Sequence, residues 1–537
     1  MMDFCRILTL SALILFASCE KEAPPDPDPD PPVVDCSVQV SDTDMVVGIT
    51  ETDSSIVFQL ESGQEIIRPA GCIQSYQVDS VLWTVHLTYQ DQTEDTLPFF
   101  GQAEIPRDSI VLNPYGFAPL TALVHFSIPY PRRVRVTVHG KGSGSLDLSH
   151  TFPEPDTNHA IPVYGLYGSY LNQVSIGILG KDGTELRTRR IQIRTGPLGN
   201  LICGPMYVTV NNYKDSLTPH FYLIHNAIYD NTGQVRWYTP FGASKYFTLY
   251  DHQIAMQIHG DKGNPVSEWE DIRILSLLGE QTGLYDVPNR NHHEINEKTP
   301  GGNLLVATNA EPYYSTDDDT EDAIVEIDRQ TGEVVKFWDL REIFDPDRER
   351  IWEEMPNDWC HLNSIQYDPS DNTLLISSKL QYFISKIDYE TGAIKWIFGN
   401  HENWGEQWQP YLLEPENFDT IVHPDRDWTY AQHMPRLTKE GNIIVYDNGR
   451  NRPGGDFTRV HEFRVDTAQM TVRTIWTHDF SYSTRALGSI YKHENNNVLI
   501  GHGEGGLLIE VNHAGEVLFE GKLKNFYRAY PIEFYQQ

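Results

Sequence analysis

Short apolar stretches separated by turn residues run through most of the chain, and they predict strands. Residues 80–89 alternate apolar and polar positions, which is typical of a strand with one buried face. The apolar run 443–446 lies between Gly441 and Gly449 and predicts a buried strand. Long stretches rich in Ala, Leu, Lys and Glu, which would favour helices, are missing. We therefore predict an all-β protein.

A strand–turn–strand pattern repeats from about residue 197 onward. Its clearest copies are residues 324–338 and 384–396, where a Thr-Gly turn joins two strands and an aromatic residue follows. Weaker copies lie at 229–237, 272–279, 460–476 and 508–517. About six copies at this spacing supply one four-stranded blade each. We therefore expect a six-bladed β-propeller over residues 197–537.

Two further β units precede the repeat. Residues 36–107 and residues 108–196 both contain strand-like runs between turn residues, so we expect two small β-sandwich (Ig-like) domains. A chain of 537 residues exceeds one ordinary core, which agrees with several domains. Neither unit contains a constellation that suggests catalysis, so both are predicted to be accessory domains.

The N-terminus predicts export. Residues 1–18 combine Arg6 with an apolar core and end in small residues, which indicates a secretory signal rather than a spanning helix. Cys19 follows directly and resembles the lipidated cysteine of a bacterial lipobox, although Phe16 replaces the usual leucine and ordinary cleavage is the alternative. Residues 19–35 are rich in Pro and Asp and predict an extended tether. We expect a lipoprotein of the bacterial outer membrane, on its periplasmic or cell-surface face.

Charge and cysteine content narrow the partners. The formal net charge of −34 argues against nucleic acid and against an anionic membrane surface, so the lipid anchor is the only membrane contact expected. In an oxidising compartment, Cys36 and Cys72 could pair because they lie in one small unit. Cys203 and Cys360 are expected to be buried free thiols or a bridge between blades. A homodimer is left open.

Three histidines recur at intervals of about 70 residues, each just upstream of a strand of similar composition. They are His293, His361 and His433. Equivalent positions of successive repeats face the same axis, so we predict that the three side chains share one small volume at the mouth of the channel. His292 adjoins His293, and the sequence leaves open which of the two faces this volume.

The surroundings of these histidines suit an oxyanion better than a metal ion. Three histidines are a familiar zinc set, but no carboxylate recurs at the equivalent positions, although Glu294 and Asp358 lie close by. Asn363 and Lys379 follow His361 and offer an amide and a cation to bind a substrate anion. We therefore expect no metal in the site.

Several long motifs of this region resemble the bacterial arylsulfate sulfotransferases. They are His-His-Glu-Ile at 292–295, Asp-Trp-Cys-His-Leu-Asn at 358–363, Ser-Lys-Ile-Asp at 385–388 and Gln-His-Met-Pro-Arg-Leu at 432–437. Residues 112–116 and 161–167 likewise resemble the β-sandwich of that family. The resemblance covers about residues 108–537, and residues 36–107 lie outside it as an additional module.

The resemblance implies transfer of a sulfuryl group from an aryl sulfate to a phenol, without the nucleotide donor PAPS or another cofactor. It implies that His433 is the nucleophile and forms a sulfohistidine in a ping-pong reaction, a role that suits a neutral imidazole. His361 and one of His292 and His293 match histidines with acid/base or sulfuryl-binding roles. A small-molecule aryl sulfate and a phenol are therefore the expected partners.

Two neighbouring residues match positions of the family that contact the substrate. Asn363 matches a sulfate-contacting position, and Lys379 stands where the family usually has an arginine. Lysine offers a point charge in place of a planar two-armed donor, so we expect sulfate binding of altered strength.

Other functions stay open at the level of the sequence. The three histidines also suit a metal-dependent propeller hydrolase. The Lys379 departure and the additional N-terminal module would suit a surface binding lipoprotein that has lost catalysis. The Thr-Gly turns followed by Trp suggest a quinone-dependent dehydrogenase, but no quinone pocket is evident in the sequence.

Overall fold

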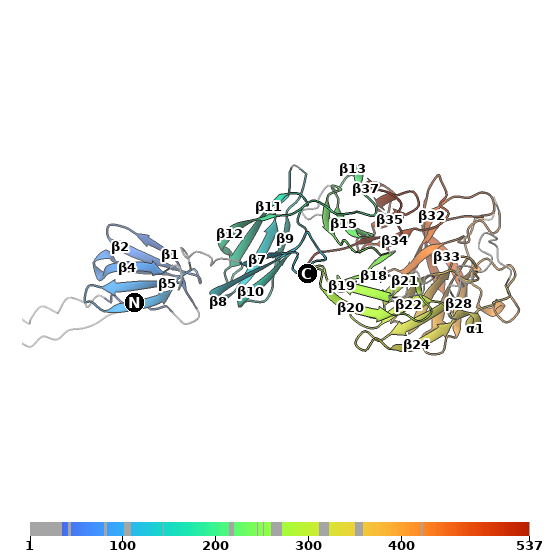
Figure 1. Cartoon of the computed structure of the whole chain (residues 1–537), viewed down its shortest axis with the longest axis horizontal. Coiled ribbons are helices and arrows are strands. Elements are labelled where there is room, and N and C mark those ends of the chain that lie inside the picture. Colours follow the sequence, from blue (N-terminus) through green and yellow to red (C-terminus); the bar gives the residue numbers. More distant parts are fainter. Residues whose placement is uncertain are drawn as a thin grey trace, which may run out of the picture. The chain divides into compact units, whose positions relative to one another are not determined.

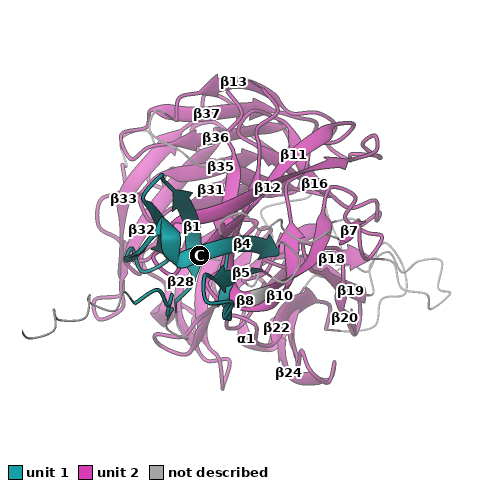
Figure 2. Ribbon diagram, turned by 90° about the vertical axis from the view of Figure 1, so that its left-hand side faces the viewer, with its two compact units in different colours: residues 1–79, 84–102 teal, residues 80–83, 103–537 magenta. Residues whose placement is uncertain are grey.

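The computed structural model describes residues 35–40, 44–79, 83–100, 109–142, 144–213, 220–243, 245–250, 252–258, 271–310, 322–348, 358–419, 421 and 423–535. The chain divides into two compact units, coloured separately in Figure 2. Unit 1 comprises Met1–Asp79 and Thr84–Gln102, and unit 2 comprises Ser80–Trp83 and Ala103–Gln537. The predicted signal segment, Cys19 and the tether up to residue 34 lie outside the described residues.

Strands make up most of the described residues (Figure 1). Within these residues the helical elements are α1 (Leu340–Ile343), η1 (Ala70–Cys72) and η2 (Gln409–Tyr411). None of them has the length and apolar content that crossing a membrane requires. The prediction of an all-β protein is confirmed.

Unit 1 contains two antiparallel sheets of three strands each. Their strands are β1 (Val46–Glu51), β2 (Ser55–Leu60) and β3 (Glu65–Pro69), and β4 (Ile73–Asp79), β5 (Thr84–Tyr89) and β6 (Glu94–Pro98). Alternate residues of β2 and β5, among them Phe58 and Leu87, are buried in a shared apolar core. Cys36 and Cys72 form a disulfide in this unit, with their Cα atoms 5.2 Å apart.

The second sandwich is built on one long strand. Its strands are β7 (Ser109–Leu112), β8 (Ala122–Val138), β9 (Leu148–Thr151), β10 (Asp156–Val163), β11 (Leu171–Leu179) and β12 (Glu185–Arg194). The first part of β8 pairs with β7 and β10, whereas its last six residues pair with β11. β8 therefore belongs to both parts of the domain, and its buried residues Val124 and Val136 face the core.

The remaining described residues form six separate sheets, all of them mainly antiparallel. Three sheets consist of four consecutive strands. These are β17 (Tyr246–Thr248), β18 (Ile254–Ile258), β19 (Asp271–Leu275) and β20 (Gln281–Asp286); β21 (Asn291–Glu297), β22 (Leu304–Thr308), β23 (Ala323–Ile327) and β24 (Val334–Asp339); and β25 (Leu362–Asp368), β26 (Thr373–Ser378), β27 (Phe383–Asp388) and β28 (Ile394–Gly399).

Of the other three sheets, one has five consecutive strands and two include strands that are far apart in the chain. One contains β29 (Glu414–Pro415), β30 (His433–Leu437), β31 (Ile443–Asp447), β32 (Arg459–Asp466) and β33 (Thr471–Asp479). One joins β34 (Ser489–Lys492), β35 (Val498–His502), β36 (Leu507–Val511) and β37 (Val517–Lys522) to β13 (Tyr207–Asn211). The last joins β14 (Phe221–Ile224), β15 (Ala227–Asp230) and β16 (Val235–Tyr238) to β38 (Ala529–Pro531).

These sheets have the arrangement of a propeller. In these sheets one end strand faces the neighbouring sheets, and we call it the first strand of the sheet. These first strands contact one another in succession: β21 contacts β25, β25 contacts β30, β30 contacts β34 and β34 contacts β38. β22 is buried along its whole length, whereas β24, at the edge of the same sheet, is largely exposed, as expected for sheets stacked face to face. The two strands from the ends of this region, β13 and β38, close the structure by pairing with β37 and β14.

The repeated Thr-Gly turns lie between the last two strands of a sheet. Gly332 and Gly392 have φ angles of 76° and 73°, a conformation that glycine adopts without steric cost. Trp338 and Trp396, which follow these turns, are buried in apolar clusters between sheets. They pack the core, as the sequence predicted. Cys203 and Cys360 are both buried, and neither forms a disulfide with a described residue.

Candidate active site

Each of the three predicted histidines lies where the first strand of its sheet departs from regular pairing. The register shifts between His292 and Ile295, between Leu362 and Ser364, and between His433 and Arg436. Such β-bulges re-aim side chains and are frequent beside active sites.

The backbone at these bulges adopts the left-handed region. The φ angle is 42° at His293, 50° at His361 and 50° at Met434, which directly follows His433. This region costs an L-residue roughly 1–2 kcal/mol, so the surrounding sheet must impose it. The strain is concentrated at the ends of β21, β25 and β30 that carry the histidines.

The structure brings these histidines together. The ring centroids of His293 and His361 lie 4.4 Å apart in an edge-to-face arrangement. The Nζ of Lys379 lies 3.4 Å from Nε2 of His361, and both side chains lie close enough to His433 to lower its pKa. His433, His361 and Lys379 are all buried.

The hydrogen bonds of His433 select its tautomer. Nδ1 lies 2.7 Å from Oδ1 of Asn448 and 3.0 Å from the carbonyl oxygen of Ala431. Asn448 donates through Nδ2 to Thr484 Oγ1 and to the carbonyl oxygen of Leu487, both at 2.9 Å, so its oxygen must face the imidazole. Both neighbours of Nδ1 are acceptors, so Nδ1 carries the proton and Nε2 keeps its lone pair.

The surroundings of His433 also keep the imidazole neutral. Burial lowers the pKa of His433 well below its ordinary value, and the Lys379 ammonium adds to this effect. His361 and the Arg528 guanidinium lower the pKa further, whereas the hydrogen bond to Asn448 opposes them. At neutral pH the ring is therefore uncharged and can act as a nucleophile.

His361 is oriented by a carboxylate. Its Nδ1 forms a short hydrogen bond with Oδ2 of Asp358, and its backbone N–H donates to Oδ1 of the same carboxylate at 2.9 Å. Nε2 lies 3.4 Å from the Lys379 Nζ. A carboxylate behind a histidine fixes the ring and stabilises its protonated form. Asp358 therefore supports a proton-transfer role for His361.

The two adjacent histidines have different surroundings. The Nε2 of His292 lies 2.9 Å from the carbonyl oxygen of Thr308, on the neighbouring strand β22, and donates to it. The ring of His293 faces His361, and its backbone carbonyl accepts a hydrogen bond of 2.7 Å from the Tyr527 hydroxyl. Of this pair, His293 is the one whose ring contacts His361.

Asn363 is buried beneath the histidines. Its Nδ2 donates to the carbonyl oxygen of Gln432 at 2.7 Å, which commits the amide nitrogen to the peptide directly before His433. Its Oδ1 has no hydrogen-bond partner among the described residues. Asn363 thus supports the backbone of His433, and the sulfate contact implied by resemblance stays a prediction.

Arg528 is a buried residue of this region that the sequence analysis missed. It directly precedes β38, and its Nη1 donates to Oε1 of Glu294 at 2.9 Å. Arg436 donates to the other carboxylate oxygen of Glu294, also at 2.9 Å. Like the histidines, Arg528 lies at the start of a first strand, and this position was the signal that could have identified it. The signal was not recognised because β38 has only three residues and does not show the repeat pattern.

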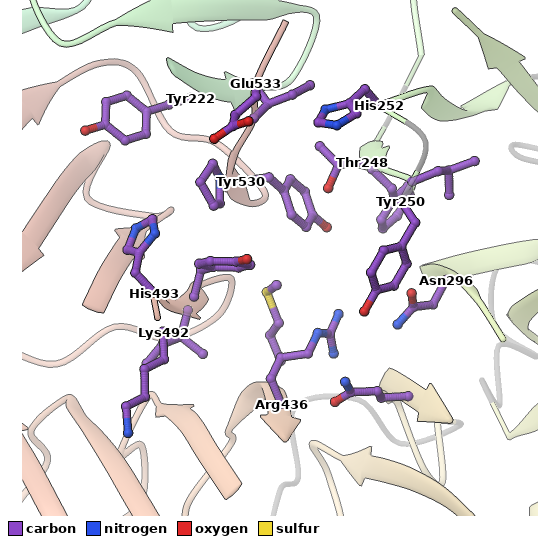
Figure 3. A pocket seen from close by; sticks show the side chains of 18 of the residues that line it. Tyr222, Thr248, Tyr250, His252, Asn296, Arg436, Lys492, His493, Tyr530 and Glu533 are labelled. Carbon is purple, nitrogen blue, oxygen red and sulfur yellow. The ribbon is translucent and has the colours of Figure 1, made fainter. Parts of the chain in front are cut away.

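A large cavity lies next to the residues of the histidine site (Figure 3). Its volume is about 650 Å³, and the far ends of the first strands line it, including Asn296, Gln366 and Leu437. Met434 and Arg436 line the cavity, whereas none of the three histidines does. The cavity is thus lined by Glu294 and Met434, which directly follow His293 and His433, but not by the histidines themselves.

The described residues contain no group of three or more His, Cys, Asp or Glu side chains that could hold a metal ion. Asp358 and Glu294, the two carboxylates nearest the histidines in the sequence, are engaged by His361 and by two arginines. The arrangement places one neutral histidine near Lys379 and Arg528, which suits the transfer of an anionic group.

Fold and site together define a β-propeller-type protein with a buried, neutral histidine beside a lysine and a second histidine. Residues 206–530 match the family model of the arylsulfotransferases (ASST), and residues 109–196 match that of the arylsulfotransferase Ig-like domain. The chain belongs to the arylsulfotransferase family. The resemblance found in the motifs is confirmed, and the class of enzyme is a sulfotransferase.

Two relatives agree with this assignment. The arylsulfate sulfotransferase AssT of Escherichia coli O6:H1 (strain CFT073) is 23% identical over an alignment that covers 68% of this chain and 79% of the relative. The protein of the same name from Lelliottia amnigena is 24% identical with the same coverage.

Solved structures with similar folds are more distant. A periplasmic gluconolactonase, PpgL, of Pseudomonas aeruginosa gives a TM-score of 0.36 at 11% identity, covering 59% of this chain and 100% of that chain. The Swd1 β-propeller domain of Myceliophteria thermophila gives 0.34 at 12% identity, covering 60% and 86%. At these TM-scores the likenesses carry no argument about function.

Proposed function

We propose that this sulfotransferase moves a sulfuryl group from an aryl sulfate to a phenol in two steps, with Nε2 of His433 as the nucleophile. The observation that carries the proposal is the pair of acceptors at Nδ1, Asn448 Oδ1 and the Ala431 carbonyl. They leave the lone pair of Nε2 available on a buried, neutral ring.

In the first step, Nε2 of His433 attacks the sulfur atom of the donor. The N–S bond forms, the bond between sulfur and the aryl oxygen breaks, and a phenolate leaves. The imidazole becomes a cation that carries the sulfonate group, and its Nδ1–H stays bonded to Oδ1 of Asn448, which stabilises the new charge.

The leaving phenolate takes a proton from His361. The carboxylate of Asp358 stabilises the protonated form of this histidine before the transfer. In the second step the acceptor phenol returns a proton to His361, its oxygen attacks sulfur, and the S–N bond breaks. His433 is thereby restored as a neutral imidazole.

Negative charge develops on the sulfuryl and leaving oxygens during both steps. Lys379 is buried, and its charge is the second-largest cause, after burial, of the lowered pKa of His433. A fixed cation in a site with little water stabilises such charge strongly. We therefore assign Lys379 to the sulfuryl group and His293 to the wall of the same pocket.

We further propose that the chain is exported and anchored by a lipid on Cys19, because residues 1–19 have the sequence features of a lipoprotein signal. An exported enzyme would not have access to the cytoplasmic nucleotide donor, so a sulfate ester as donor suits this location.

The test is turnover of a chromogenic aryl sulfate, with and without phenol, by the wild type, by His433→Ala and by His461→Gln. His461 is a buried histidine of β32, in the same sheet as His433, and serves as the matched control. We expect phenol to stimulate release of the chromophore, His433→Ala to abolish it and His461→Gln to retain it. Full activity of His433→Ala would refute the nucleophile, and release indifferent to phenol would indicate a hydrolase.

A further inference from the structure

The guanidinium of Arg528 is enclosed by residues that neighbour the histidines. Its side chain is fully buried, and Arg528 lies directly before β38, the strand that closes the propeller by pairing with β14. Nη1 donates to Oε1 of Glu294 at 2.9 Å, and Nη2 donates to the carbonyl oxygen of Asn363 at 2.6 Å. The two arms of this one side chain thus reach two different sheets.

Each contact ends beside one of the histidines. Glu294 directly follows His293, and Asn363 is the second residue after His361. Asn363 in turn donates through Nδ2 to the carbonyl oxygen of Gln432, at 2.7 Å, and Gln432 directly precedes His433. We call Glu294, Arg528, Asn363 and Gln432 the Arg528 network. All four residues are buried.

A second arginine closes the network from the side of His433. Arg436, three residues after His433, donates to the remaining oxygen of Glu294 at 2.9 Å and to Oγ of Ser364 at 2.5 Å. The carboxylate of Glu294 is therefore held by two guanidinium groups. Each of the strands β21, β25 and β30 thus has at least one residue that is hydrogen-bonded to this network.

We propose that Arg528 is a positioning residue for sulfuryl transfer, which holds the bulges of His293, His361 and His433 at a fixed spacing. The inference rests on the proposed function for its kinetic consequence. Because positive φ angles at these bulges are costly, the strands need an external restraint to keep them. Displacement of a reacting group by about 1 Å can cost about 100-fold in rate.

The charge of Arg528 gives the network a second measurable effect. Burial first, then Lys379, His361 and Arg528 together lower the pKa of His433, and the hydrogen bond that its Nδ1–H donates to Asn448 raises it. Removal of the guanidinium should therefore raise the pKa of His433. The acid limb of the pH–rate profile would then move to higher pH.

The test compares Arg528→Met with Arg236→Met. Arg236 is a matched control because it is equally buried, pairs with Asp230 at 3.0 Å and donates to the carbonyl oxygen of Gly165 at 2.7 Å, but lies in β16 away from the histidines. We expect Arg528→Met to lower kcat about 100-fold with KM little changed, and to shift the acid limb upward. Arg236→Met should lose stability while its kcat and acid limb stay as in the wild type.

Arg528→Lys covers the case in which Arg528→Met does not fold. Lysine keeps a cation beside Glu294 but lacks the two diverging arms that reach Glu294 and the Asn363 carbonyl. We expect this variant to fold, to keep the acid limb and to lose kcat. A wild-type kcat in Arg528→Lys would overturn the proposal.

Ring signals of the histidines provide a readout that does not need turnover. In the full chain labelled at histidine, NMR of Arg528→Met should show shifts at His293, His361 and His433 together, whereas Arg236→Met should leave them in place. If the wild type proved unable to transfer sulfate, this comparison would still decide the role of Arg528. Unchanged ring signals in a folded Arg528→Met protein would overturn it.

Discussion

The side-chain oxygen of Asn448 decides which nitrogen of His433 is available for chemistry. It can do so because Thr484 Oγ1 and the Leu487 carbonyl accept from the amide nitrogen and prevent the amide from turning. A residue 15 positions away in the sequence thus defines the reactive atom of the nucleophile.

At the residue scale, Lys379→Met should reduce kcat/KM about 100-fold, because a buried cation beside the sulfuryl group is lost. Among the charged groups, Lys379 lowers the pKa of His433 the most, and only burial lowers it more. The same change removes this effect. The pKa of His433 therefore rises, and activity should be lost at a higher pH during acidification. A kcat/KM profile across pH measures both effects.

Two variants control this prediction. Lys379→Arg keeps the charge, so its acid limb should stay where it is in the wild type. Lys386→Met removes another buried lysine, in β27, whose partners are Asp368 and Asp371 and not the histidines. This change should leave the acid limb unchanged. An acid limb that does not move in Lys379→Met would contradict the electrostatic role.

Several of these residues could be predicted from the sequence, but not their partners. The repeat placed His293, His361 and His433 in one region because equivalent positions of a propeller face one axis. Asp358 and Glu294 were identified only as carboxylates near the histidines, and nothing in the sequence distinguishes the one that orients His361 from the one that binds two arginines. Those contacts depend on side-chain direction at bulges, which a periodic pattern does not encode.

At the scale of the element, the bulges explain why adjacent residues have different surroundings. His433 belongs to the histidine site, whereas Met434, with a φ angle of 50°, lines the large cavity. Likewise His293 faces His361 while Glu294 lines the cavity. A regular strand also alternates its faces, but only the bulge allows three sheets to aim a histidine at the same point.

Unit 1 depends on its disulfide, since its core is small. Cys36 and Cys72 are separated by 36 positions, and a loop of this length stabilises the folded state by about 4 kcal/mol. Replacing both with Ser should lower the free energy of unfolding of this unit by that amount. Limited proteolysis at increasing urea concentration, followed by detection of residues 36–100, measures the loss.

The matched change is Cys203→Ser, which replaces a buried free thiol in unit 2. It should leave the protease resistance of unit 1 unaltered. Sulfuryl transfer should be unaffected by the loss of the disulfide, because every residue assigned to the site belongs to unit 2. Equal resistance of the double variant and the wild type would refute the stabilising role.

At the scale of the whole molecule, the proposed export and anchoring lead to a direct prediction. Cys19→Ala should remove the lipid, and the chain should then leave the membrane fraction, because no other part of it is expected to hold it there. Incorporation of radiolabelled palmitate and fractionation of cells measure the two effects. Retention of both label and membrane association in Cys19→Ala would exclude lipidation at this residue.

Architecture was the part of the whole molecule that the sequence predicted best. Strand periodicity and Thr-Gly turns sufficed for the all-β class, and the pairing of Cys36 with Cys72 was one of the options considered. The closure by β13 and β38 escaped prediction because these strands have only five and three residues and pair with partners roughly 300 positions away. Arg528 was missed for the same reason.

This closure has a consequence for the timing of activity during biosynthesis. Ribosomes make the chain from its N-terminus, so the segment that contains Arg528 and β38 is made after the segments that carry the three histidines. A nascent chain that does not yet contain Arg528, or one cut by a protease between His433 and Arg528, has all three histidines but not the residue that ties them together. The site would therefore be complete only after Arg528 has been added.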